Sequence, residues 1–312
     1  MIRLLAFCCL ATPAMADLDA VLDTHVLPRM DSFAAAARDL AQAPCDAMSD
    51  PFAETALAWA AVSHLALGPA EEGGRASAIL FWPDDRDATR RGLQLLEAQG
   101  PDAWTPEALA RASVAARGLG ALERLIFEAD TQPCDLIKAL ARDLAATAGA
   151  VNDGWRGEFG QAMRTAGQPG NTRFLAPEEA EAAFFTVLVA GLTHIAEDRL
   201  GRPMGTFERP RPARAELRRS GLSMDIVIAA LTAQRELASA LAPDPRTDAV
   251  LSRALDAARA LPRDALARTE DLSMRFRVEA LQSVVREAAG IAQEEIGDAL
   301  AVQAGFNAGD GD

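Results

Sequence analysis

The sequence predicts an all-α protein made of two helical-bundle halves. Alanine, leucine, arginine and glutamate dominate the chain, whereas aromatic residues make up only 5% of it. This composition favours helix over strand. Prolines stand at several positions where a helix would begin. Apolar residues recur three and four apart in the longest segments, which is the pattern of a helix with one buried face.

The first half is expected to contain five helical stretches. Asp50-Pro51 and Thr105-Pro106 each place a proline at the first position of a helix, directly after a residue that can cap it. The irregular segment 68–85 interrupts this half. The predicted helical stretches are 18–42, 51–67, 86–98, 106–128 and 134–165.

The second half follows a turn-like segment at residues 167–176 and begins at Pro177, before two glutamates that suit the start of a helix. Its clearest helix covers residues 264–302, where residues such as Met274 and Val278 recur on one face. The remaining predicted segments are the helices 177–200, 221–241 and 246–260 and the irregular stretch 201–213.

These patterns divide the chain into a signal peptide, one helical domain and a short tail. The predicted divisions are residues 1–16 for the signal, 17–305 for the helical domain with bundles at about 17–166 and 177–305, and 306–312 for a tail.

The first sixteen residues resemble an export signal. Arg3 supplies a positive charge, Leu4 to Leu10 form a short apolar run, and Ala14-Met15-Ala16 reads as a cleavage site. The run is shorter than the about 20 residues that cross a bilayer, and charges interrupt every later apolar run. The sequence therefore predicts a periplasmic protein, cleaved after Ala16, without a transmembrane segment.

Charge and cysteine content narrow the function further. The formal net charge is −14, which argues against nucleic acid or an anionic membrane as the main partner.

Removing the signal leaves Cys45 and Cys134, and two cysteines in an oxidising compartment predict a disulfide, with two free thiols as the alternative. Closing this loop of roughly 90 residues would stabilise the fold by about 4 kcal/mol.

Strong catalytic signatures are missing from the sequence. It contains no H-E-x-x-H, C-x-x-C, Gly-rich phosphate loop or G-x-S-x-G motif. Among the three histidines, His194 lies one helical turn before Glu197, which is a spacing that ferritin-like carboxylate sites use. The alternative is an ordinary ion pair on a helix surface.

The other two histidines lie in the first half. His64 stands near a helix end, with Glu72 shortly after it in the irregular segment, so it is either a ligand at the mouth of a pocket or a histidine that caps its helix. Nothing in the sequence distinguishes His25 from a surface residue.

An arginine-rich segment covers residues 199–219. It includes Arg199, Arg209 and Arg211, whose guanidinium groups are candidates for binding a carboxylate or phosphate. Arg117 is a further candidate outside the segment. The alternative is that these arginines pair with acidic residues across a bundle interface.

Residues 118–123, Gly-Leu-Gly-Ala-Leu-Glu, resemble the G-x-H-x-x-E motif of the imelysin-like proteins, also called the M75 peptidase family. The resemblance extends over the whole exported chain, including the helix of Trp59 and the Arg199-Leu200-Gly201 turn. It implies an all-helical fold of two bundle-like halves, residence in the bacterial cell envelope and a link to iron acquisition. A peptidase activity is also attributed to the family.

The chain departs from this motif at its histidine. Gly120 occupies that position, whereas Gly118 and Glu123 remain. Zinc sites normally need three or four protein ligands, so an iron or zinc site that the family implies is either lost or rebuilt from His64, Glu72 and His194. Alternatively, Glu123 pairs with an arginine such as Arg117 or Arg199, and close packing accounts for Gly120.

The sequence therefore favours a periplasmic, non-catalytic binding or accessory protein in the acquisition of iron or another metal, with no catalytic residue assigned. Its partner would be a metal ion or an envelope protein. The alternatives are a metal-dependent peptidase of the M75 type and an envelope scaffold that binds a protein partner through its arginine-rich segment.

Overall fold

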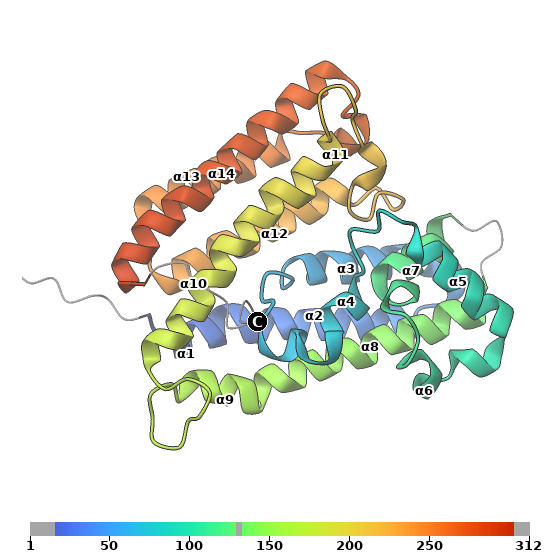
Figure 1. The fold of residues 1–312 in the computed structure, drawn as a ribbon, viewed down its shortest axis with the longest axis horizontal. Coiled ribbons are helices and arrows are strands. Elements are labelled where there is room, and N and C mark those ends of the chain that lie inside the picture. Colours follow the sequence, from blue (N-terminus) through green and yellow to red (C-terminus); the bar gives the residue numbers. More distant parts are fainter. Residues whose placement is uncertain (1–15, 129–132, 303–312) are drawn as a thin grey trace, which may run out of the picture.

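The computed structural model describes residues 16–128 and 133–302, and within these two ranges it contains helices and connecting segments but no strand. The all-α prediction is confirmed. Most of the predicted signal peptide and the whole predicted tail lie outside the described residues. The helices form two groups, one on each side of the segment before residue 177 (Figure 1).

The N-terminal group is built around two long antiparallel helices. The first runs unbroken from Leu18 to Gln42 and consists of α1 (Leu18–Val21), the π-helical segment η1 (Leu22–Val26) and α2 (Leu27–Gln42). It packs along α8 (Cys134–Arg156) and against α3 (Ser49–Ala60). The remaining helices of this group are α4 (Arg75–Ile79), α5 (Ala88–Gln99), α6 (Pro106–Leu109), α7 (Gly118–Phe127) and α9 (Glu158–Arg164), with short 3-10 turns at Cys45–Ala47, Gly68–Ala70, Glu72–Gly74, Pro101–Trp104 and Val114–Ala116.

The C-terminal group also begins with one unbroken helix. It comprises α10 (Pro177–His194), the π-helical segment η7 (Ile195–Gly201) and α11 (Arg202–Met204). This helix packs against α12 (Ser223–Leu241) and α14 (Leu272–Leu300), and α13 (Pro245–Arg259) lies between α12 and α14 in the chain and contacts both. The short 3-10 turns of the C-terminal group are Pro212–Arg214 and Ala265–Arg268.

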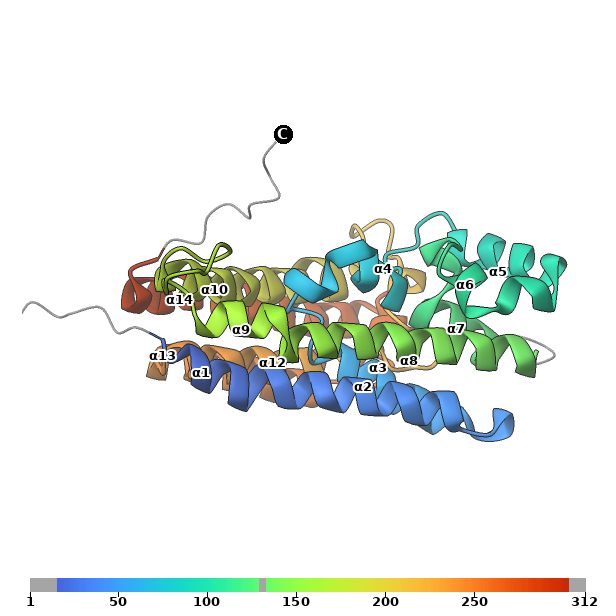
Figure 2. The same cartoon turned by 90° about the horizontal axis from the view of Figure 1, so that it is seen from below.

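The two groups share one continuous apolar core. Helix α12 provides the contact, because it packs on α10 in its own group and on α3, α1 and η1 of the other. Seen from below, the long helices of both groups lie in stacked layers (Figure 2). Loops from both groups therefore meet at the same boundary.

One helical stretch in the described residues, Pro177–Met204, has the length and mean hydropathy, 1.3, of a membrane span. More than half of its apolar window, 56%, is buried inside the fold, as is usual for the central helix of a bundle. The expectation that the chain lacks a transmembrane segment stays a prediction.

The predicted helix at 106–128 is instead three pieces, α6, a 3-10 turn and α7, and Gly118 explains the last break. Its φ is +67°, a left-handed conformation that strongly favours glycine. The carbonyl oxygens of Ala78 and Ile79 both lie 2.2 Å from the place where a Cβ would stand. Gly118 therefore lets α4 approach the start of α7.

The predicted disulfide is confirmed. Cys45 and Cys134 are bonded across 89 residues of sequence, and the bond joins the turn after α2 to the start of α8. Because α2 and α8 pack along each other, the bond fixes one end of the longest helix pair in the N-terminal group.

Replacing both cysteines, as Cys45→Ser/Cys134→Ser, is expected to lower the free energy of unfolding by about 4 kcal/mol, because the unfolded chain loses a long closed loop. Urea unfolding followed by far-UV circular dichroism measures this loss. Reductant should shift the midpoint of the wild-type protein and leave that of the double variant unchanged. Identical wild-type midpoints with and without reductant would contradict the prediction.

Candidate functional site

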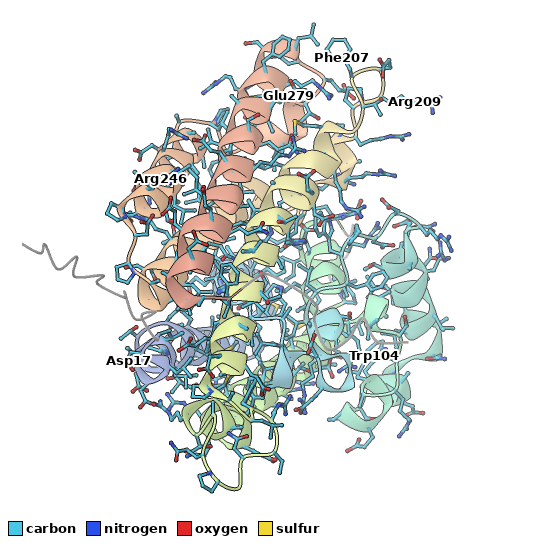
Figure 3. The ribbon with its side chains drawn as sticks, turned by 60° about the vertical axis from the view of Figure 1, so that its left-hand side comes forward. Asp17, Trp104, Phe207, Arg209, Arg246 and Glu279 are labelled. Carbon is cyan, nitrogen blue, oxygen red and sulfur yellow. A yellow bond between two sulfur atoms is a disulfide. The ribbon has the colours of Figure 1, made fainter. Side chains whose placement is uncertain are left out.

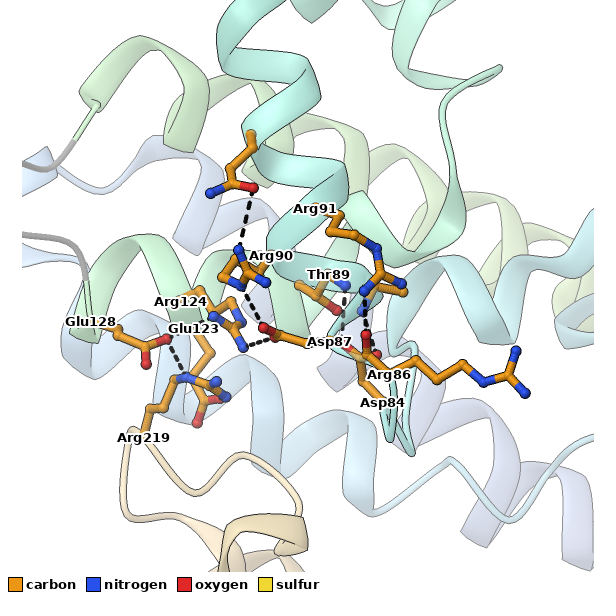
Figure 4. Close-up of polar contacts among 12 residues, drawn as sticks. Asp84, Arg86, Asp87, Thr89, Arg90, Arg91, Glu123, Arg124, Glu128 and Arg219 are labelled. Atoms are coloured by element: carbon orange, nitrogen blue, oxygen red, sulfur yellow. Dashed lines mark hydrogen bonds and ion pairs between the residues drawn. The ribbon is translucent and has the colours of Figure 1, made fainter.

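A cavity of about 550 Å³ lies where the two helix groups meet. Its wall consists of residues 80–90, one side of α7 and residues 211–219. The close-up shows Arg90 and Arg124 directed toward Asp87, and Arg219 directed toward Glu128 (Figure 4). Gly120 and Glu123 of the G-x-G-x-x-E sequence thus lie on a polar cavity.

Glu123 is the buried carboxylate of this wall. Its Oε1 accepts hydrogen bonds from the backbone N–H of Ser220 at 3.0 Å and from the Ser220 hydroxyl at 2.9 Å. The Arg219 guanidinium lies 3.6 Å from its Oε2. Burial raises the pKa of Glu123 above its usual range, although Ser220 and Arg219 oppose the shift. The carboxyl group is therefore already satisfied by the facing loop.

Neither arginine that the sequence offered as a partner of Glu123 bonds to it. Arg117 donates to both carboxylate oxygens of Asp143 at 2.8 Å, and Arg199 forms a buried ion pair with Glu216 at 2.7 Å. Both guanidinium groups are engaged in structural pairs and neither lines the cavity.

Gly120 lines the cavity beside Glu123, and packing does not require a glycine there. A Cβ at this position would meet only the Phe81 carbonyl oxygen at 3.8 Å and the Leu80 Cδ1 at 4.0 Å, which are ordinary contacts. An imidazole would begin in open space. The expectation that close packing accounts for Gly120 is therefore wrong.

An ion-pair chain runs along one wall of the cavity. Asp87 bonds to both Arg90 and Arg124, and Glu128 bonds to both Arg124, at 3.1 Å, and Arg219, at 2.5 Å. The hydrogen bond from Arg90 is the main cause that lowers the pKa of Asp87. The chain links α5, α7 and the facing loop through charged side chains (Figure 4).

The other charged groups of the wall differ in whether they have partners. Asp84 accepts hydrogen bonds from two backbone N–H groups at the start of α5, which outweigh its burial and lower its pKa. Asp85 pairs with Arg214 at 3.1 Å. Arg211 and Arg218 also line the cavity, but they form no ion pair with any residue in the described ranges.

Histidines 25 and 64 form a buried pair away from the cavity. Their Nε2 atoms are 3.0 Å apart, so one ring donates to the other, and both side chains are buried. The expectation that His25 resembles a surface residue is wrong, because α12 of the other helix group covers this side of the first helix. His64, offered as a pocket ligand, faces His25 instead.

Burial keeps both imidazoles neutral. It lowers the pKa of His25 to about 3, with the nearby Arg29 charge adding to the effect. Burial also places the pKa of His64 well below its usual range. Gln234 lies in the same buried layer, since both its amide and the His64 Cβ approach Gly191. The pair therefore belongs to the contact between the two helix groups.

His194 and Glu197 do not bond to each other. The His194 Nδ1 lies 2.9 Å from the Asp198 carboxylate, whereas Glu197 pairs with Arg286 on α14. His194 and Asp198 are four residues apart, which is a usual spacing for a pair on one helix face. Burial, followed by the Arg199 charge, lowers the pKa of His194.

The last two sequence candidates lie at the surface. Glu72 is exposed and pairs with Arg75 at 3.0 Å. Arg209 stands on the loop after α11 and projects from one end of the molecule, close to Phe207 (Figure 3). The metal-ligand candidates Glu123, His64, Glu72, His194 and Glu197 thus have separate partners, and no group of three or more His, Cys, Asp or Glu residues that could hold a metal ion exists in the described part of the chain.

The structure adds Ser220 to the candidate residues, and it gives particular roles to two arginines of the arginine-rich segment. Ser220 and Arg219 satisfy Glu123, and Arg218 faces the cavity. They lie at or just beyond the end of the arginine-rich segment, so that segment was the available signal. Residues 80–85 belong to the irregular stretch that interrupts the first half, and their contribution to the wall depends on tertiary contacts.

Comparison with known proteins agrees with this architecture. The sequence matches the family model for imelysin, peptidase M75, over residues 14–301. No curated protein matches it. The fold superposes on an imelysin-like protein from Psychrobacter arcticum 273-4 with a TM-score of 0.77 at 19% identity, covering 93% of this chain and 96% of that one. A second structure, from Parabacteroides distasonis ATCC 8503 and provisionally named an iron-regulated protein A precursor, gives a TM-score of 0.73 at 12% identity, with 91% and 96% covered.

The buried histidine pair makes stability depend on pH. Because the pKa values of His25 and His64 are lower in the folded protein than in the unfolded chain, the unfolded chain takes up more protons below about pH 6.5. Stability is expected to fall as the pH drops through this value, by up to about 2.7 kcal/mol per pH unit for the two groups together. Urea unfolding between pH 5 and 7 measures the slope.

The matched variant is His25→Leu/His64→Leu, which replaces both partners with apolar groups of similar size and should keep most of the stability at pH 7. It should lose the steep part of the pH dependence. An unchanged slope, or an NMR spectrum showing either wild-type imidazole protonated at pH 5, would refute the assignment.

Proposed function

Because the chain belongs to the imelysin family, we propose that it is an exported, non-catalytic binding or accessory protein that serves the acquisition of iron or another metal. Its ligand site is the cavity beside α7. The name of the Parabacteroides distasonis protein, which shares the fold, refers to iron regulation, and this agrees with the proposed role.

The proposal depends on one observation, which is that the motif residues Gly120 and Glu123 offer no free metal ligand. Gly120 contributes no side chain, and Glu123 is held by Ser220 and Arg219. A catalytic metal site in a peptidase needs protein ligands, a metal-bound water and a general base. The donor set around Glu123 does not fit a resident metal ion, because the lining holds no histidine or cysteine, its five carboxylates already have partners, and six arginines stand among them.

The cavity itself favours binding. Its volume of about 550 Å³ lies in the range of small-molecule sites. Its walls are fixed by ion pairs between different elements, such as Arg124 with Asp87 and Arg219 with Glu128. A preformed polar cavity of this kind can hold a ligand without a large ordering cost.

Two features support an exported protein. The first sixteen residues have the charge, apolar run and small residues of a cleaved signal. The disulfide between Cys45 and Cys134 suits an oxidising compartment such as the periplasm.

The non-catalytic role predicts that the protein will not cleave an unfolded substrate such as reduced casein, with zinc or iron added. The rates for wild-type protein, Glu123→Gln and wild-type protein with a chelator should be equal, because no metal-bound water forms. Electrophoresis of timed samples checks this. Cleavage that a chelator stops and that Glu123→Gln loses would instead establish a peptidase.

The cavity's role predicts a difference between two substitutions of Gly120. Gly120→Ala should stabilise α7 by about 0.5–1 kcal/mol and leave metal retention intact, because the alanine Cβ fits. Gly120→Trp should fill the cavity and weaken retention at least tenfold, or about 1.4 kcal/mol.

Retention is measured by equilibrium dialysis followed by elemental analysis, with iron and zinc each offered as simple salts and as citrate chelates. The Gly120→Ala protein is the matched control for Gly120→Trp. The proposal would be overturned if no form of either metal were retained at 10 µM, or if Gly120→Trp retained as much as Gly120→Ala.

A further inference from the structure

We infer that the cavity binds a small multivalent oxyanion, a carboxylate or phosphate compound, through Arg211 and Arg218, so that a metal would enter it as an anionic chelate and not as a free cation. This inference rests on the proposed function for the location of the site. It adds the chemical class of the ligand, which follows from the charges of the wall.

The cavity is locally positive in an acidic protein. Six arginines and five carboxylates line it, which leaves one net positive charge, whereas the whole chain carries −14. A concave site of one sign raises the local concentration of ions of the opposite sign. An anion is therefore drawn to this wall more strongly than to the rest of the surface.

None of the five carboxylates is free to attract a cation. Asp84 accepts from the start of α5, and Glu123 from Ser220. The other three, Asp85, Asp87 and Glu128, each bond to one or more arginines. A metal ion would have to compete with these partners for its first ligand.

Arg211 and Arg218 are the two guanidinium groups of the wall that have no acidic partner among the described residues, and both side chains are exposed. Their backbones are nevertheless held in place. The Arg211 N–H donates to the Pro203 carbonyl at 2.9 Å. Arg218 follows the buried Leu217, whose carbonyl oxygen lies 2.9 Å from the Ser220 hydroxyl oxygen.

These two side chains meet the requirements for recognising an oxyanion. A guanidinium group presents several N–H donors in a planar fork that matches carboxylate and phosphate oxygens. Two such groups on one wall favour a ligand with more than one anionic group. The missing side chain at Gly120 leaves room beside them, because a Cβ there meets no atom closer than 3.8 Å.

The test uses isothermal titration of the full-length exported protein with citrate, with pyrophosphate and with zinc chloride. The variant is Arg211→Gln/Arg218→Gln, in which both changes lie on exposed side chains. The matched control is Arg38→Gln/Arg209→Gln, which removes the same charge from exposed arginines outside the cavity.

We expect wild-type protein to bind citrate, pyrophosphate or both, with an affinity that falls as salt is added. The cavity variant should bind at least tenfold more weakly, and the control within twofold of wild type. Binding of citrate alone assigns a carboxylate ligand, and binding of pyrophosphate alone assigns a phosphate ligand.

Two results would overturn the inference. One is equal anion binding by wild type and cavity variant, or no anion binding up to 1 mM. The other is tight binding of zinc chloride that the cavity variant keeps, in which case the proposed function stands and only the ligand class is wrong. If neither anion nor metal binds, the proposed function falls as well.

Discussion

The structure depends on satisfying one buried carboxylate. Glu123 lies inside the N-terminal helix group, where an ionised side chain without partners would be strongly unfavourable. Its hydrogen bonds come from Ser220, which the C-terminal group supplies. The loop that carries Ser220 is thereby drawn onto α7, and the cavity is the space enclosed between them. Glu123, which the chain keeps from the motif, therefore brings the two sides of the site together.

A second buried ion pair, between Arg199 and Glu216, holds the same loop in place. Arg199 bonds to Glu216, which lies within the cavity segment 211–219, and to the Ser63 hydroxyl in the turn after α3. Breaking such a pair by removing one partner typically costs about 3–5 kcal/mol, because a charge is left buried alone. The same arginine therefore joins three distant segments, which is a structural task and explains why it cannot also serve as a free anion site.

The sequence was sufficient for features that depend on local pattern, and insufficient for those that depend on contact between the halves. Helical periodicity and proline positions identified the long helices. The presence of only two cysteines after the predicted signal identified the bond between Cys45 and Cys134. The burial of His25 could not be read, because the residues that cover it lie some 200 positions away on α12. The pairing of His194 was missed because carboxylates stand both three and four residues after it, and the sequence does not show that Arg286 on α14 bonds to Glu197.

The two π-helical segments make the direction of the later side chains depend on the number of residues in the helix. In a π-helical turn the hydrogen bonds span five residues in place of four, so the turn holds one more residue than an α-helical turn. Since each residue advances an α-helix by about 100°, an α-helix without that extra residue would point its later side chains toward a different neighbour. Arg199 lies within such a segment, between Ile195 and Gly201. The direction of the Arg199 side chain toward Glu216 thus depends on the number of residues in the helix as much as on their identity. A homologue with a helix of different length would need another residue to hold the same loop.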